Sequence, residues 1–113
     1  MHPDIHIKAR VVVQLKGENL LGPGRIELME KIQSTGSISE AARDMGMSYR
    51  KALQLINHIN DLCGQEVILT WKGGTEHGGA RLSLFGEDLV LRYKALTTKV
   101  SALLATEGAI FLQ

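Results

Sequence analysis

The sequence lacks several features that mark large classes of protein. It has one cysteine, Cys63, so a disulfide within the chain is excluded, which is typical of a reducing compartment. Its net charge is only +1, so neither sign dominates the whole chain. No uninterrupted apolar run approaches the roughly 20 residues of a membrane-spanning helix, and the polar start at residues 1–6 is unlike a signal peptide. We therefore expect a cytoplasmic protein with no membrane partner.

The residue groupings that carry catalysis or hold metals are also missing. The sequence has no Ser/His/Asp grouping, no paired acids in an apolar setting and no His/Cys cluster at metal-ligand spacing. His2 and His6 are four residues apart but have no third candidate ligand. The glycine-rich stretch 73–79 lacks the Gly-Lys-Ser/Thr ending of a nucleotide-binding phosphate loop. The sequence thus favours a protein that is not an enzyme and holds no metal or other cofactor.

What the chain does contain suits one globular domain spanning residues 1–113. Hydrophobic residues make up 44% and aromatic residues 4%, so the core must consist mainly of Leu, Ile, Val, Ala and Met. Apolar and polar residues alternate from Ile5 to Leu15, which predicts a half-buried strand that ends at Gly17-Glu18-Asn19. Pro23 then begins a helix that ends before Gly36 and is expected to brace the segment that follows.

Two helical patterns joined by a tight turn occupy residues 37–63 and predict a helix-turn-helix. Either Ser37 or Ser39 can cap the first helix. Gly46 supplies the turn because it tolerates a positive φ, and Ser48 caps the second helix. Five side chains of the second helix share one apolar face: Ala52, Leu55, Ile56, Ile59 and Cys63. The cysteine on that face is expected to be a buried, small apolar group and not a nucleophile.

The polar start of the second helix predicts contact with DNA. Its first turns contain no acid, and Arg50 and Gln54 can bridge the hydrogen-bonding edges of guanine and adenine. Ser48, Lys51 and the helix N-terminus suit phosphate. The predicted DNA-binding residues of the helix-turn-helix are Ser37, Ser39, Ser48, Tyr49, Arg50, Lys51 and Gln54.

Two strand patterns joined by a glycine-rich loop follow at residues 67–84 and predict a β-hairpin wing. The strands are expected at residues 67–72 and 80–84, with the loop at 73–79. Glycines let a backbone lie close to a sugar–phosphate wall. The wing side chains able to bond such a wall are Lys72, Thr75, His77 and Arg81. An exposed hairpin tip that binds nothing has the same composition and remains the alternative.

A long helix is predicted from about residue 86 to 106. Its apolar residues recur with near-heptad spacing, and those assigned to a dimer interface are Leu89, Tyr93, Leu96, Val100 and Leu103. Packing against the domain's own core would use the same side chains. A helix of about 20 residues is ~30 Å long, however, which is more than a small winged domain needs to cover itself. We therefore favour a two-fold homodimer in which the long helices pair.

Together these elements predict a mainly α fold with a small β-sheet, namely a winged helix-turn-helix with a long C-terminal dimerisation helix. The segment 25–93 resembles the N-terminal domain of the molybdate-responsive regulator ModE family. The residues that carry this resemblance are GSISEAARDMGMSYRKALQLINHIN, VILTWKGGTEHGGARL and SLFGEDLVLRY. A looser likeness to the helix-turn-helix of LysR-type regulators covers the same motif, although the wing of those proteins is less rich in glycine.

The resemblance implies a transcriptional regulator that binds a pseudo-palindromic operator in double-stranded DNA as a homodimer. Regulators of this family bind molybdate in C-terminal modules, and the chain ends at Gln113 without room for them. We therefore expect a ModE-like protein that lacks the molybdate-binding domain. It would act alone, use a sensor on a separate protein, or respond to another signal. The near-neutral charge supports an alternative, a winged-helix module that binds protein and not DNA.

Overall fold

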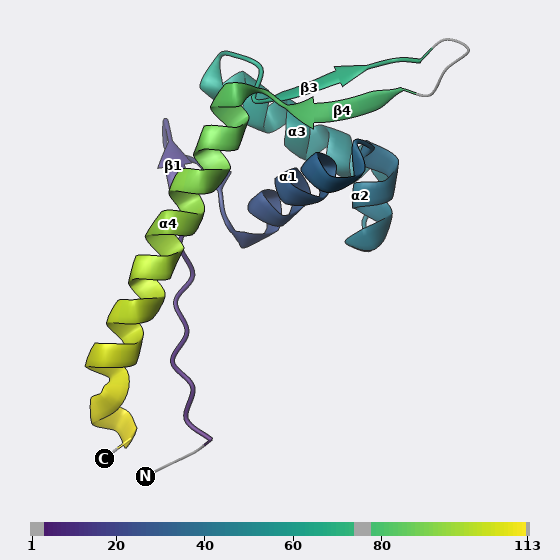
Figure 1. Ribbon diagram of the computed structural model, residues 1–113. Coiled ribbons are helices and arrows are strands. Elements are labelled where there is room, and N and C mark those ends of the chain that lie inside the picture. The colour runs from purple at the N-terminus through teal and green to yellow at the C-terminus, as the bar shows by residue number, and fades with distance from the viewer. Residues whose placement is uncertain (1–3, 74–77, 113) are drawn as a thin grey trace.

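The computed structural model describes residues 4–73 and 78–112 (Figure 1). Two short strands, β1 (Val13–Leu15) and β2 (Glu18–Leu21), form an antiparallel hairpin and lead into α1 (Pro23–Thr35). The helices α2 (Ile38–Asp44) and α3 (Tyr49–Cys63) follow. Strands β3 (Ile68–Trp71) and β4 (Gly79–Leu82) make a second antiparallel hairpin, and the chain ends in α4 (Leu84–Glu107) and a 3₁₀ helix (Gly108–Leu112). The predicted fold class is confirmed, with two small sheets in place of one.

The helix-turn-helix forms where the sequence places it because each boundary has its own cap. Gly36 ends α1 with a φ of 71°, a left-handed conformation that glycine adopts without steric cost. Ser37, and not Ser39, caps α2, since its side-chain oxygen accepts a hydrogen bond from the Glu40 N–H at 3.1 Å. Ser48 caps α3 in the same way through the Lys51 N–H at 3.0 Å.

The core lies between the three helices of the body and the inner face of the second hairpin. The side chains of Leu28, Met29 and Ile32 from α1 are completely buried. Ala41 and Ala42 of α2 are buried beside them, and these small residues let the helices approach closely. On α3 the buried face comprises Ala52, Ile56, Ile59 and Leu62. Leu55 and Cys63 pack against the core from this helix but are only half-buried, and Leu62 is buried there as well. The expectation that Cys63 is a buried group is therefore wrong.

The N-terminal segment departs from the predicted strand. Only Val13–Leu15 is a strand, and residues 5–12 are not paired in a sheet. The alternation identified an apolar face but could not supply a partner strand, which a ladder of hydrogen bonds requires. The predicted end at Gly17-Glu18-Asn19 is also wrong. The turn is at Lys16 and Gly17, whose φ angles are 55° and 79°, and Glu18 and Asn19 begin β2.

Helix α4 leaves the body on the side opposite the wing (Figure 1), and the molecule measures 62 × 28 × 21 Å. Its N-terminal half packs on the domain, where Val90 and Tyr93 are buried. The Tyr93 hydroxyl donates to the Val11 carbonyl at 2.9 Å, and Lys94 Nζ donates to Glu30 Oε2 of α1 at 2.6 Å. No residue between Lys94 and Glu107 is buried, so this half of the helix projects beyond the core.

The sequence was expected to contain no stretch apolar enough to span a membrane, but α4 is more apolar than that expectation allowed. In the part of the chain that the structure describes, the helical stretch Leu84–Leu112 is long and apolar enough to cross a membrane by length and composition alone. Little of the most apolar part of this stretch is buried. The expectation considered uninterrupted apolar runs, whereas here polar residues are interspersed among leucines, alanines and valines. This helix therefore presents apolar side chains that the isolated chain does not cover.

Candidate nucleic-acid interface

The start of α3 presents the side chains that the sequence assigned to base reading. Arg50, Lys51 and Gln54 are exposed, and the first turn contains no acidic residue. Arg50 and Gln54 are four residues apart, so they lie on the same side of the helix, away from its buried stripe. A helix N-terminus carries a partial positive charge, and Arg50 and Lys51 add full positive charges to it. This end of α3 is therefore suited to a polyanion.

A groove runs between the second hairpin and the helices α2 and α3. It is lined by Thr35, Gly36, Ser37, Ile38, Ser39, Glu40, Arg43, Tyr49, Leu53, Thr70, Trp71, Lys72, Gly73, Gly78 and Gly79. Four of the predicted DNA-binding residues, Ser37, Ser39, Tyr49 and Lys72, thus meet in one place. The Ser37 oxygen is already used as the cap of α2, whereas Ser39 is exposed.

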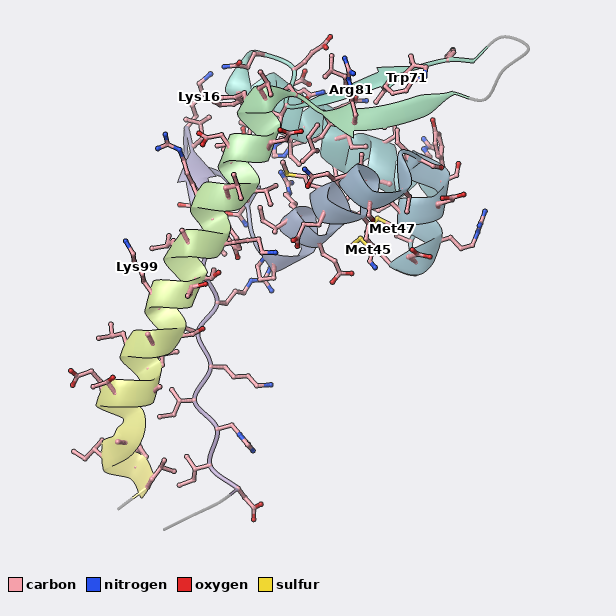
Figure 2. All side chains as sticks on the ribbon, in the orientation of Figure 1. Lys16, Met45, Met47, Trp71, Arg81 and Lys99 are labelled. Atoms are coloured by element: carbon pink, nitrogen blue, oxygen red, sulfur yellow. The ribbon has the colours of Figure 1, made fainter. Side chains whose placement is uncertain are left out.

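The other predicted contacts that the structure describes, such as Ser48 and Arg81, do not line this groove. Ser48 is exposed at the start of α3 with its oxygen engaged in the cap. Arg81 is exposed on β4, and Figure 2 shows its side chain together with that of Trp71 on the second hairpin. The predicted contacts Thr75 and His77 lie outside the residues that the structure describes.

A backbone hydrogen bond holds the second hairpin against the helix-turn-helix. The Ala80 N–H donates to the Gly36 carbonyl at 3.0 Å, which joins β4 to the turn between α1 and α2. Antiparallel pairing of Trp71 with Gly79 continues the hairpin outward from that point. The groove between the hairpin and the helices is therefore defined by fixed backbone on both sides.

Arg43, Leu53 and Trp71 are among the groove residues that sequence reasoning missed. Arg43 follows Ser39 by four residues on α2, so helical periodicity alone puts both on one face and could have identified it. Its charge adds to that of Lys72 and is opposed by Glu40. Trp71 had no local signal, because its position depends on the pairing of two strands that are separated by a loop.

The side chains predicted to form a dimer interface divide into two groups. Tyr93 is only 7% exposed and Leu89 packs against the same core, so both contribute to the domain itself. The farther residues Leu96 and Leu103 are 44% and 58% exposed, and Val100 is half-buried. The exposed part of the predicted dimer interface along α4, here called the seam, therefore begins at Leu96.

Neither a reactive thiol nor a metal-binding cluster contributes to this surface among the described residues. The half-buried Cys63 lies at the opposite end of α3, and burial raises the pKa of its thiol while Lys16 opposes that shift. A raised pKa keeps the thiol protonated and so disfavours nucleophilic chemistry. Among the described residues, no group of three or more His, Cys, Asp or Glu side chains could hold a metal ion.

Comparison with known proteins gives a consistent picture of the chain. No protein-family model matches it. It is 38% identical over 94 residues to the transcriptional regulator ModE of Yersinia pestis, covering 81% of this chain and 36% of that protein. It is 36% identical over 92 residues to the DNA-binding transcriptional dual regulator ModE of Escherichia coli K12, covering 80% and 35%. The matched stretch is a ModE-family domain.

Two further comparisons extend this result. The ModE-family domain is 38% identical over 98 residues to the molybdenum-pterin-binding protein MopB of Rhodobacter capsulatus, covering 87% of the chain and 36% of that protein. The chain thus spans about a third of the length of these relatives. In three dimensions it resembles ArgP from Mycobacterium tuberculosis, with a TM-score of 0.54 and 20% identity over 78% of this chain and 30% of that one, which supports a shared fold.

Proposed function

We propose that this ModE-family domain binds double-stranded DNA sequence-specifically as a homodimer and thereby regulates transcription in the cytoplasm, without enzymatic activity. The observation that carries the proposal is the exposed, acid-free start of α3, which presents Arg50, Lys51 and Gln54 beside the groove under the second hairpin. That arrangement suits a recognition helix whose N-terminal residues enter the major groove. The relatives from Yersinia pestis and Escherichia coli, both named as transcriptional regulators, support it.

In the proposed complex the charged side chains have two separate tasks. Arg50 and Gln54 read base edges, because a guanidinium pairs with guanine and a carboxamide with adenine. Lys51, Lys72 and Arg81 hold phosphates, which fixes the register of the helix but carries no sequence information. The two-fold mate places a second recognition helix about one turn of DNA away, roughly 34 Å.

The first experiment selects bound sequences from a random duplex pool and then measures fluorescence anisotropy on the best duplex. Arg50→Ala should weaken specific binding by about 1–3 kcal/mol and leave binding to random duplex nearly unchanged. Lys72→Ala should weaken binding to both duplexes and lower the slope of log affinity against log salt by about one. Lys99→Ala, which removes an exposed charge on α4 that points away from the body in Figure 2, is the matched control.

The same measurements distinguish the alternative of a protein-binding module. A DNA binder loses affinity steeply as salt rises, because phosphate contacts release counterions. If no duplex in the pool is enriched and affinity for any DNA is flat with salt, the proposal is wrong and a protein partner is favoured. If DNA binds but Arg50→Ala behaves like Lys99→Ala, the base-reading role belongs to another residue.

A further inference from the structure

Trp71 is the chain's only tryptophan, and it lies at the outer end of β3 with 49% of its surface exposed. Side chains alternate along the hairpin, and Ile68, Ala80 and Leu82 are buried on its inner face. Trp71 shares the other face with Leu69, Gly79 and Arg81. The indole is therefore not required to fill the core of the domain.

The backbone of the opposite strand holds the indole in place. A Cβ added at Gly79 would lie 2.5 Å from Trp71 Cζ2 and 2.8 Å from Cε2, so the ring lies directly across this glycine. The neighbouring Ala80 N–H is bonded to the Gly36 carbonyl at 3.0 Å, which fixes the same strand to the start of the helix-turn-helix. The ring is thus pre-organised relative to α2 and α3.

The surroundings of the ring are those of the proposed DNA face. Trp71 lines the groove together with Tyr49, Arg43 and Lys72, and Arg81 follows Gly79 by two residues on the same face of the hairpin. The chain has only five aromatic residues, and two of them, Tyr49 at 51% and Trp71 at 49% exposure, border this groove. Large aromatic side chains left exposed among basic residues are typical of a binding surface.

We propose that Trp71 contacts DNA directly, with the indole packed on a deoxyribose of the backbone beside the phosphates that Lys72 and Arg81 hold. This inference rests on the proposed function. The flat indole covers the apolar edge of the sugar, and its N–H can donate to a phosphate oxygen. Because Gly79 holds the ring in advance, little side-chain freedom is lost on binding. The contact contributes affinity and positions the hairpin, while Arg50 and Gln54 read the bases.

Because Trp71 is the only tryptophan, the intrinsic fluorescence of the domain reports on the surroundings of this one side chain. The wild-type domain is titrated with the selected duplex, and tryptophan emission, its quenching by acrylamide and the anisotropy of labelled DNA are followed in parallel. We expect emission to change with the same midpoint as anisotropy, and acrylamide quenching to be lower at saturation than in the free protein. Trp71→Ala should weaken binding roughly tenfold, as loss of an aromatic contact with nucleic acid does, while Trp71→Phe retains most of the affinity.

Control variants distinguish loss of the Trp71–DNA contact from loss of the folded structure. Leu91→Ala removes another exposed apolar side chain, on α4, and should leave the affinity unchanged. Thermal unfolding of each variant shows whether it folds, and the wild-type emission and quenching need no variant. If the wild type binds duplex by anisotropy while its emission and quenching stay constant, the contact is absent and the proposed function stands. If the wild type binds no duplex at all, both proposals are wrong.

Discussion

Asn60 shows how one side chain can organise a strand without lying in it. Its amide oxygen accepts from the Val67 N–H at 2.8 Å and the Ile68 N–H at 3.1 Å, and its amide nitrogen donates to the Ile68 carbonyl at 3.0 Å. Val67 and Ile68 are almost completely buried, so water does not easily replace these bonds. The side chain thus joins the end of α3 to the beginning of β3.

We expect Asn60→Ala to lower the free energy of unfolding by about 2–4 kcal/mol, because it leaves buried backbone donors without partners. Asn57→Ala is the matched control, since Asn57 is exposed on the same helix and its change should lie within about 0.5 kcal/mol. Urea unfolding followed by circular dichroism measures both. Equal, small effects for the two variants would mean that the hydrogen bonds of Asn60 contribute little to stability.

Two helical glycines should respond in opposite directions to the same substitution. A Cβ at Gly86 of α4 would collide with the Val67 carbonyl oxygen, whereas a Cβ at Gly24 of α1 has no atom within 4 Å. Gly24→Ala should therefore stabilise the domain by about 0.4–1 kcal/mol by reducing the freedom of the unfolded chain. Gly86→Ala should destabilise it by about 1–3 kcal/mol, because α4 or β3 must move. Thermal unfolding of the two variants side by side tests the sign, and stabilisation by Gly86→Ala would contradict this close packing.

At the scale of elements, the sequence predicted what local interactions determine. The helix boundaries follow from caps that lie within four residues of the groups they bond, as at Ser37, Gly36 and Ser48. The strand predicted from residue 5 was mostly wrong, because periodicity contains no information about the partner. Its actual neighbour in the fold is distant, since Val11 is bonded by Tyr93, 82 residues away.

As with the secondary structure, only the parts of the candidate site that depend on local sequence could be predicted. The start of α3 could be described from sequence because its residues are consecutive. The groove could not, since it depends on the bond between Ala80 and Gly36 and on the register that pairs Trp71 with Gly79. Arg43 is the exception, because it follows Ser39 on the same helix face. Contacts between distant segments therefore account for the missed residues of the hairpin, such as Trp71.

On the scale of the whole molecule, most of the large exposed apolar side chains lie along the N-terminal segment and the last helices. The large ones in the N-terminal segment and along the last helices are Ile5, Ile7, Val12, Leu84, Phe85, Leu91, Leu96, Leu103, Ile110, Phe111 and Leu112. The N-terminal segment runs beside α4, and both described ends of the chain lie at the same end of the molecule (Figure 1). Gly108 is buried there, and a Cβ on it would collide with Ile7. The exposed apolar residues on the projecting half of α4, among them Leu96 and Leu103 but not Leu91 on the opposite face, suit a second copy of the chain.

The proposed homodimer gives the last prediction. The double variant Leu96→Glu with Leu103→Glu places two charges on the exposed part of the predicted seam. Neither side chain belongs to the core, so the domain should fold while pairing of α4 with its mate is lost. Affinity for a two-half-site operator should then fall by about 100-fold or more, because the two recognition helices no longer bind as one unit. Binding to a single half-site should change little.

A charge-matched control distinguishes disruption of the dimer interface from the general effect of adding two acidic residues. Leu91→Glu with Thr98→Glu adds the same two charges on the opposite face of α4, where both side chains are exposed. Light scattering after size-exclusion chromatography gives the mass of each variant, and anisotropy on one-site and two-site duplexes gives the affinities. We expect the control to remain dimeric and to bind the operator within a few-fold of wild type. A seam variant that keeps the dimer mass would instead assign the interface to another surface, with the N-terminal segment as the next one to test.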